Sequence, residues 1–179
     1  MRIIGGRYRG KKLISPESDK VRPTSDKARE ALFNILRSRL GNDFGNFSLI
    51  DVFSGSGAFG LEALSQGFAF VALVDIDTRD LQKNTVLFAN EQSRIKVVRA
   101  DAAQTFALPE KYDVLFMDAP YNKGLTEKAL VNAKAVLAKG ALCLIEVEKN
   151  EVCTLPEEYK LLDERRYGLA KILIAEFIG

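Results

Sequence analysis

Histidine is absent from this chain of 179 residues, and cysteine occurs only twice. Without histidine there can be no histidine-based catalytic triad, no HExxH zinc site and no imidazole general base. Proton transfer must then rely on carboxylates, lysine, tyrosine or backbone carbonyls. Cys143 and Cys153 are too few for a disulfide framework and lack the spacing of zinc ligands. We therefore expect reduced thiols, no metal site and a cytoplasmic protein.

Long apolar runs are also missing. No stretch is long enough to span a bilayer, and the basic N-terminus, Met1–Arg7, lacks the apolar core of a signal peptide. There are no internal repeats or low-complexity tracts. The length favours one domain, and contents of 47% hydrophobic and 28% charged residues are ordinary for a globular protein. We expect a single domain over residues 1–179, with a basic extension over 1–20 and a catalytic core over 21–179.

Charge is unevenly distributed along the chain. Residues 1–45 contain eleven Lys and Arg against five Asp and Glu, whereas the remainder contains fifteen against nineteen. Five of the basic residues fall within the first twelve positions. A basic N-terminal face attracts phosphates, although a merely solvated basic end would show the same pattern.

Hydrophobic periodicity predicts alternating strands and helices. Residues 2–15 suggest two short strands around their glycines, and a helix over Asp26–Leu40 has Thr24 or Ser25 as its cap. Further strands are expected at 48–53, 69–75, 95–99, 112–117 and 141–147, and further helices at 58–66, 79–90, 102–106 and 126–137. The last two strands, 159–166 and 170–177, form an antiparallel pair. Nearly continuous apolar strands that alternate with helices predict an α/β fold with a mostly parallel, doubly wound sheet.

The most informative motif is Asp118-Ala119-Pro120-Tyr121, which directly follows the apolar run 114–117. The carboxylate can accept hydrogen bonds, the tyrosine ring can stack, and proline fixes the backbone between them. Such a site can hold a flat polar group.

A second motif, 55–60, matches GxGxxG between a predicted strand and helix, and indicates a ligand that approaches the backbone closely. Asp75 follows twenty positions after Gly55, where a carboxylate can accept both hydroxyls of a ribose. These two features fit a nicotinamide dinucleotide and S-adenosylmethionine equally well.

Further carboxylates favour S-adenosylmethionine. Asp51 precedes the glycines, where it can meet a cationic amino-acid end but would repel a pyrophosphate. Asp101, followed by Ala102, ends the third core strand, where a carboxylate can accept from an adenine amine; it can equally cap a helix. The acidic character of the whole pocket suits a sulfonium.

Together the two motifs suggest methyl transfer to the exocyclic amine of a base. Such an amine is a weak nucleophile, and two acceptors, the Asp118 carboxylate and the Ala119 carbonyl, would draw its nitrogen towards a tetrahedral form. Tyr121 would stack on the base, while Asp118 or solvent takes the released proton. The base must be single-stranded, looped out or flipped to reach the site.

The chain resembles the RsmD family, bacterial methyltransferases of the guanine exocyclic amine in small-subunit ribosomal RNA. The resemblance lies in the opening residues 1–10, in the segment 22–36 and in the glycine motif with the helix that follows it. It implies a Rossmann-like methyltransferase fold with a seven-stranded sheet, S-adenosylmethionine as the cofactor, and 16S rRNA of the small subunit or an assembly intermediate as the partner. The family's tetrapeptide usually has proline where this chain has Ala119, but the carbonyl is retained.

The resemblance and the motifs give a full set of expected site residues. The expected catalytic residues are Asp118, Ala119, Pro120 and Tyr121. The expected cofactor residues are Asp51, Phe53, Ser54, Gly55, Ser56, Gly57, Asp75, Ile76, Asp101 and Ala102. The expected RNA-binding residues are Arg2, Arg7, Tyr8, Arg9, Lys11, Lys12, Arg22, Thr24 and Arg29, and the protein is expected to act as a monomer.

Three alternatives remain at this point. A DNA adenine-N6 methyltransferase uses the same tetrapeptide, although this short chain has little room for a DNA-recognition region. A nicotinamide oxidoreductase shares the glycine motif but needs a group that handles hydride chemistry. A non-catalytic ribosome assembly factor could retain a vestigial site, which Ala119 alone favours.

Overall fold

The order of strands in the sheet determines where a ligand can bind. The computed structural model describes residues 1–15 and 25–179, in which seven strands form one sheet in the order β3-β2-β1-β4-β5-β7-β6. Strands β3, β2, β1, β4 and β5 are parallel, whereas β7 is antiparallel to both β5 and β6. The strands are β1 (Ser48–Val52), β2 (Phe70–Asp75), β3 (Ile95–Arg99), β4 (Tyr112–Asp118), β5 (Leu137–Glu148), β6 (Tyr159–Tyr167) and β7 (Ala170–Phe177).

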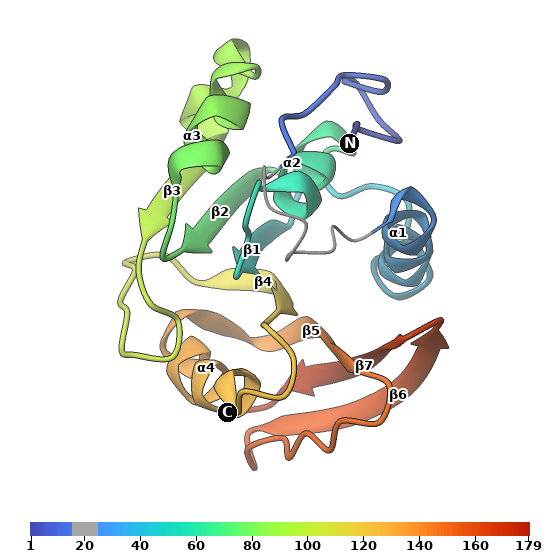
Figure 1. The fold of residues 1–179 in the computed structure, drawn as a ribbon, viewed down its shortest axis with the longest axis vertical. Coiled ribbons are helices and arrows are strands. Elements are labelled where there is room, and N and C mark those ends of the chain that lie inside the picture. The colour runs from blue at the N-terminus through green and yellow to red at the C-terminus, as the bar shows by residue number, and fades with distance from the viewer. Residues whose placement is uncertain (16–24) are drawn as a thin grey trace.

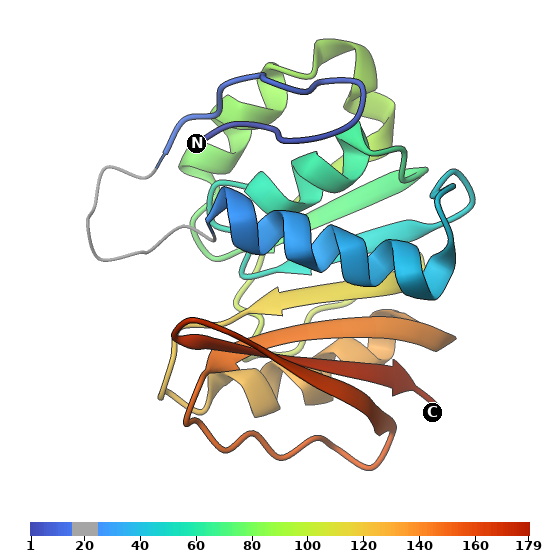
Figure 2. The same ribbon diagram turned by 90° about the vertical axis from the view of Figure 1, so that its right-hand side faces the viewer.

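Helices cover both faces of this sheet (Figures 1 and 2). The helices are α1 (Asp26–Leu40), α2 (Ala58–Ser65), α3 (Arg79–Val86) and α4 (Leu125–Ala133), with short 3₁₀ turns η1 (Ala89–Arg94) and η2 (Lys134–Val136). One core contains Leu49 and Val71 together with side chains of α1, α2 and α3, and the other contains Ile50 and Ala72 together with α4. Successive strand residues therefore face opposite layers, as in a doubly wound sheet. The predicted fold class is confirmed.

Helix α1 forms as its sequence predicts. The Ser25 hydroxyl accepts a hydrogen bond from the Ala28 N–H at 3.2 Å, and Gly41 ends the helix with φ 88°. Its apolar face, which includes Leu32, Phe33 and Leu36, is buried in the core. Each such side chain contributes about 1.5–3 kcal/mol when it leaves water.

Several predicted elements differ in the structure. The helix expected at 126–137 ends at Ala133 and is followed by η2, and the strand expected at 141–147 already begins at Leu137. Residues 2–15 form no extended strands; they fold back with a single antiparallel bridge between Arg2 and Lys12. The helix expected at 102–106 is only a turn, closed by a hydrogen bond from Gln104 N to Asp101 O at 2.9 Å. The helix expected at 79–90 ends at Val86 and gives way to η1. Residues 2–15 are shaped by their contacts with the core more than by their own propensity.

Candidate active site

A large cleft lies at the carboxyl ends of the parallel strands. The strand order reverses at β1, which pairs with β2 on one side and β4 on the other, and ligands of open α/β sheets bind at such a switch point. The cleft has a volume of about 1510 Å³, which exceeds the roughly 300–1,000 Å³ of a pocket for one small ligand. It therefore has room for a cofactor and a base together.

The glycine loop between β1 and α2 forms one wall. Phe53 lines the cleft with φ 63°, an uncommon conformation for a residue with a side chain that often marks a functional site. Gly57 lies so close to Leu81 of α3 that a Cβ atom there would stand 2.4 Å from the leucine Cδ1. Leu81 therefore packs closely against the loop at Gly57, whereas Gly55 is open and lines the cleft.

Asp75 holds the glycine loop in place at the end of β2. Its Oδ2 accepts from the Gly55 N–H and its Oδ1 from the Asp77 N–H, at 2.8 and 2.9 Å. A carboxylate oxygen has two lone pairs, so each oxygen can still accept a hydrogen bond from a ligand. Ile76, with 63% of its surface exposed, lies beside it in the cleft.

Asp101, which follows β3, is a further carboxylate in the part of the cleft that was expected to hold the cofactor. Its Oδ1 accepts from the Ala103 N–H at 2.9 Å, so it caps a turn and also lines the cleft with the buried Ala102. The structure thus brings together Phe53, Gly55, Asp75, Ile76, Asp101 and Ala102, all of which were expected around the cofactor.

Asp51 takes a different position. It is buried in β1, and its Oδ2 accepts from the Gly60 N–H at 2.9 Å within α2. Burial raises the pKa of this carboxyl to about 7, against the lowering effect of the Gly60 bond. Among the described residues, Asp51 in β1 and Ser54, Ser56 and Gly57 in the loop itself do not line the cleft.

The Asp118-Ala119-Pro120-Tyr121 loop lines the cleft beside the glycine loop, because it follows β4, which pairs with β1. All four of its residues line the cleft, and the Ala119 side chain is buried. The Tyr121 side chain is 37% exposed, and its hydroxyl donates to Glu146 Oε1 at 2.8 Å. Burial raises the pKa of Tyr121, and the charges of Glu146 and Asp118 raise it further.

Glu146 is a cleft residue that the sequence analysis missed. It lies directly across from Asp118 in the register of β4 and β5, and only 7% of it is exposed. Its signal in the sequence is a single carboxylate inside the apolar run 141–147, where a strand buried on both faces would have none.

The cleft is less acidic than its motifs suggest. Several basic side chains line it together with the carboxylates, namely Lys27, Arg79, Lys83, Lys123 and Arg166. Arg79 is paired with Asp77 and Lys83 with Asp80, at 2.6 and 3.0 Å. The expected acidic pocket is therefore replaced by one of mixed charge.

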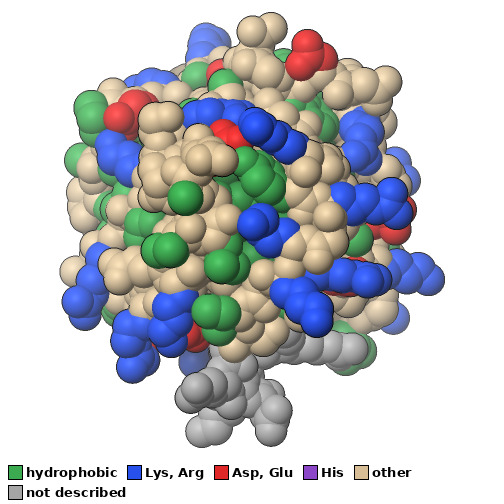
Figure 3. Space-filling view, turned by 90° about the horizontal axis from the view of Figure 1, so that it is seen from above, with side chains coloured by type: hydrophobic (Ala, Val, Ile, Leu, Met, Phe, Trp, Pro, Cys, Tyr) green, Lys and Arg blue, Asp and Glu red, His purple; other side chains and the backbone are tan. Residues whose placement is uncertain are grey.

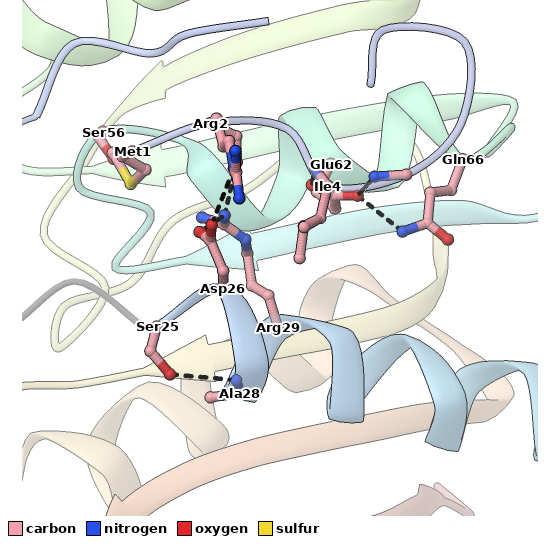
Figure 4. Close-up of polar contacts among 11 residues, drawn as sticks. Met1, Arg2, Ile4, Ser25, Asp26, Ala28, Arg29, Ser56, Glu62 and Gln66 are labelled. Atoms are coloured by element: carbon pink, nitrogen blue, oxygen red, sulfur yellow. Dashed lines mark hydrogen bonds and ion pairs between the residues drawn. The ribbon is translucent and has the colours of Figure 1, made fainter. Parts of the chain in front are cut away.

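The N-terminal segment, residues 1–15, is bound to the core mainly through its backbone. The Ile4 and Gly5 N–H groups each donate to the buried Glu62 carboxylate of α2 at 2.8 Å (Figure 4). Ser65 adds a hydrogen bond to Gly5 O at 2.6 Å. Near its end, Ile14 exchanges hydrogen bonds with the buried Asn84 side chain, which also donates to Ser56 O in the glycine loop.

Several side chains of this segment contact the protein. The Tyr8 hydroxyl donates to Glu91 at 2.7 Å, and its ring packs edge-on against Phe88, so Tyr8 is not free to stack on a base as expected. Arg7 also pairs with Glu91, and Lys11 donates to Leu87 O. Arg2 pairs with Asp26 at 3.3 Å while most of its side chain stays exposed.

Arg29 contradicts the expectation that it binds RNA. Its side chain is fully buried, and one nitrogen donates to Arg2 O and to Asp26 at 2.7 and 2.8 Å (Figure 4). A guanidinium without solvent exposure is not available to an RNA backbone. Burial lowers its pKa, whereas the charges of Glu62 and Asp26 raise it. Arg22 and Thr24 lie outside the described residues.

The face that carries the N-terminal segment is rich in lysine and arginine, with few acidic side chains among them (Figure 3). Arg9 and Lys12 belong to this segment, and within the described chain neither forms a side-chain hydrogen bond or ion pair. They are the expected RNA contacts that the fold leaves most available.

Comparisons with known proteins agree with this geometry. A family model described as "Conserved hypothetical protein 95" matches residues 1–176. The chain is 36% identical to "Ribosomal RNA small subunit methyltransferase D" of Escherichia coli K12 over 175 residues, which cover 94% of the chain and 85% of that protein. The Haemophilus influenzae protein of the same name is 32% identical, with coverages of 94% and 90%.

The chain belongs to the RsmD family. Among solved structures, a "Putative methyltransferase yhhF from Escherichia coli" superposes with a TM-score of 0.83 at 30% identity and covers 100% of this chain and 98% of its own. The RsmD fold seen here is therefore shared over the whole length. Within the described residues, no group of side chains is suited to hold a metal ion and no helix could cross a membrane.

Proposed function

We propose that this RsmD family member is an S-adenosylmethionine-dependent ribosomal RNA methyltransferase that modifies the exocyclic N2 amine of a guanine in 16S rRNA. The observation that carries the proposal is that the Asp118–Tyr121 loop and the glycine loop follow adjacent strands and line one cleft. The named relatives act on small-subunit ribosomal RNA, which supports the substrate class. We further propose that it acts in the cytoplasm as a monomer, on the small subunit or an assembly intermediate.

The cofactor half of the cleft fits S-adenosylmethionine, which supplies a methyl group on a sulfonium. Asp75 and Asp101 are suited to accept from a ribose and from an adenine amine, with Ile76 packed on the adenine ring. The Ser54 hydroxyl, in the loop between β1 and α2, is buried without a hydrogen-bond partner among the described residues and does not line the cleft, so Ser54 would shape the loop and not contact the cofactor directly.

Asp51 would act on the amino-acid end of the cofactor from its place in β1. It fixes the start of α2 through the Gly60 N–H, and its negative charge, when present, favours a cation at the loop. Ser56 and Gly57 would shape the loop without lining the cleft.

In the neighbouring loop, the Asp118 carboxylate and the Ala119 carbonyl would accept the two hydrogens of the guanine N2 amine. This would localise the nitrogen lone pair for attack on the methyl group that S-adenosylmethionine supplies, with the electron pair of the methyl–sulfur bond left on sulfur. The proton released from nitrogen passes to Asp118 or to solvent. Tyr121, anchored by Glu146, presents its ring face to the base.

The test is to incubate the protein with methyl-labelled S-adenosylmethionine and small ribosomal subunits from cells that lack the enzyme, and to digest the RNA to nucleosides. Label in N2-methylguanosine is the expected result. Label in N6-methyladenosine would show that the target atom is adenine N6 and not guanine N2. Incorporation into duplex DNA instead of RNA would show that the substrate is DNA. Cofactor binding without transfer to mature or immature subunits would favour a non-catalytic assembly factor.

A further inference from the structure

Glu146 stands out among the buried carboxylates of this protein because it faces the cleft. Glu62 and Glu91 are occupied by donors of the N-terminal segment. Glu146, in contrast, lies within the apolar part of β5 and lines the cleft together with Asp118. The two residues are partners in a parallel ladder, so their side chains leave the sheet on the same face, from backbones only about 4.8 Å apart.

Only part of the Glu146 carboxylate is used by the protein. Oε1 accepts the Tyr121 hydroxyl at 2.8 Å, and within residues 1–15 and 25–179 no other side chain donates to Glu146. Because Glu146 lines the cleft, the remaining oxygen, Oε2, can accept a hydrogen bond from a donor on a ligand.

The edges of the bases differ in what they offer to such an acceptor. On guanine, the N2 amine adjoins N1–H, so two neighbouring positions donate. On adenine, the N6 amine adjoins N1, which carries no hydrogen and accepts; on cytosine, the N4 amine adjoins the acceptor N3. Two neighbouring acceptors in the protein thus match guanine and oppose adenine and cytosine.

We propose that Glu146 is a specificity-determining residue that accepts the guanine N1–H through Oε2, beside the Asp118 and Ala119 acceptors that hold the N2 amine. This inference rests on the proposed function and gives it a physical basis for choosing guanine. It also assigns two roles to one side chain, since Oε1 anchors the Tyr121 ring that stacks on the same base.

The charge of Glu146 responds to such a ligand. Burial raises the pKa of Glu146, whereas the hydrogen bond from Tyr121 lowers it. A guanine N1–H adds a second donor and so favours the ionised carboxylate. A protonated Glu146 would instead offer an O–H, which matches a ring nitrogen that accepts.

The experiment compares guanine with 2-aminopurine, which keeps the 2-amino group but has no hydrogen on N1. The nucleotide that the wild-type enzyme modifies is mapped first, and 2-aminopurine is then placed there by splinted ligation of the RNA before reconstitution of the subunit. We expect the wild-type enzyme to prefer guanine in kcat/KM on the order of 100-fold or more, because a site built to accept N1–H is left unpaired by the analogue.

The decisive variant is Glu146→Gln, which keeps the size of the side chain. An amide can turn its NH₂ group towards an unprotonated N1, so the variant accommodates 2-aminopurine better than the carboxylate does. We expect kcat/KM on guanine to fall roughly 10- to 100-fold, and the preference for guanine over 2-aminopurine to fall at least about tenfold. A loss through misfolding would lower both substrates alike and leave the ratio unchanged.

Two further variants separate recognition from positioning. Tyr121→Phe removes the hydroxyl that bonds to Glu146 but leaves the carboxylate in place, so activity should fall while the preference for guanine persists. Glu148 lies two residues further along β5 and is not among the described residues that line the cleft. The Glu148→Gln variant should therefore have the kcat/KM of the wild type on both substrates.

The inference fails in ways that differ from failure of the proposed function. A wild-type enzyme that makes N2-methylguanosine while Glu146→Gln keeps the parental ratio would overturn the recognition role alone. So would a Tyr121→Phe variant that reproduces the altered ratio, because Glu146 would then act only through the tyrosine. A wild-type enzyme that favours 2-aminopurine over guanine would show that Glu146 donates, and a product other than N2-methylguanosine would overturn the proposed function itself.

Discussion

The N-terminal segment and the Asp118–Tyr121 loop are both rich in polar groups, but they use them in opposite ways. In the segment, backbone N–H groups and the Tyr8 hydroxyl are bonded to buried carboxylates of α2 and η1. In the loop, polar groups at the end of β4 line an open cleft. Polar groups that are buried against the core hold the fold together, whereas polar groups that face a cleft can also contact a ligand.

The same contrast holds for the carboxylates beneath the two regions. Glu62 is fully buried and accepts from Ile4, Gly5 and Gln66, so its acceptors are filled by the fold. Glu146 is nearly as buried but accepts one side-chain hydrogen bond among the described residues. Burial alone therefore does not separate structural from functional carboxylates; the count of donors around them does.

The largest expected effect separates chemistry from binding at the loop. Asp118→Ala should lower the single-turnover rate of methyl transfer by roughly 10³-fold or more, because it removes an acceptor aimed at the reacting amine. Cofactor affinity, measured by calorimetry, should stay within about threefold of the wild type, since Asp118 is not among the residues proposed to hold the cofactor.

A matched control is Asp43→Ala. Asp43 lies in the loop before β1, at the amino-terminal ends of the parallel strands, and among the described residues its side chain accepts only from Gly45 N. It should leave the rate unchanged. Near wild-type turnover in the Asp118 variant would rule out the proposed mechanism, whatever happens to stability.

The second prediction tests whether the N-terminal segment is structural. At Gly6, φ is +75° and a Cβ atom would lie 1.9 Å from Ser65 O, whereas Gly10 has φ +86° with nothing within 4 Å. Gly6→Ala should lower the free energy of unfolding by about 3 kcal/mol or more, because both backbone strain and a clash oppose docking. Gly10→Ala should cost only about 1 kcal/mol from backbone strain. If denaturant titrations show equal losses of unfolding free energy for the two variants, the contact of the N-terminal segment with α2 does not contribute to stability.

Much of the fold follows from periodicity in the sequence. The helix over Asp26–Leu40 and the strand over Ile95–Arg99 have the predicted bounds, because long amphipathic or apolar runs dominate their surroundings. The predictions for 102–106 and for 2–15 were wrong: the first segment is only a turn closed locally at Asp101, and the second takes its shape from distant partners such as Glu62 and Asn84. Those partners lie dozens of positions away in the chain and cannot be inferred from local pattern.

The candidate site divides in the same way. Asp75 and Asp118 could be placed in advance because the carboxyl ends of parallel strands converge at one edge of a sheet. The burial of the Arg29 side chain could not be predicted, because charge and helical spacing do not show which arginine or lysine of a helix is buried. Glu146 escaped notice because only the register of β5 against β4 brings it to Asp118.

The third prediction concerns Asp51, whose pKa is raised by burial to about 7. A carboxyl group that binds its proton more tightly when folded destabilises the folded state once it ionises, so its contribution to stability falls as pH rises from roughly 4 to 7. Asp51→Asn cannot ionise. The free energy of unfolding of the wild type relative to this variant should fall by about 2 kcal/mol between pH 5.5 and 7. A difference that stays constant over this range would place the pKa of Asp51 near its ordinary value.

The smallest expected effect concerns the basic residues that the fold leaves available. Arg9 and Lys12 form no side-chain bond within the described chain, so each can neutralise a phosphate, and the double variant Arg9→Ala/Lys12→Ala should flatten the slope of log affinity against log salt by about 1 to 1.5. Stability should not change, unlike in Gly6→Ala. Lys111 is the control: it lies just before β4, at the amino-terminal ends of the parallel strands, and its ammonium donates to Ala135 O. The Lys111→Ala variant should keep the parental slope. If the double variant also keeps the parental salt slope, Arg9 and Lys12 do not contact RNA phosphates. The N-terminal segment would then only pack on the core through its backbone, and the RNA would bind elsewhere on the basic face.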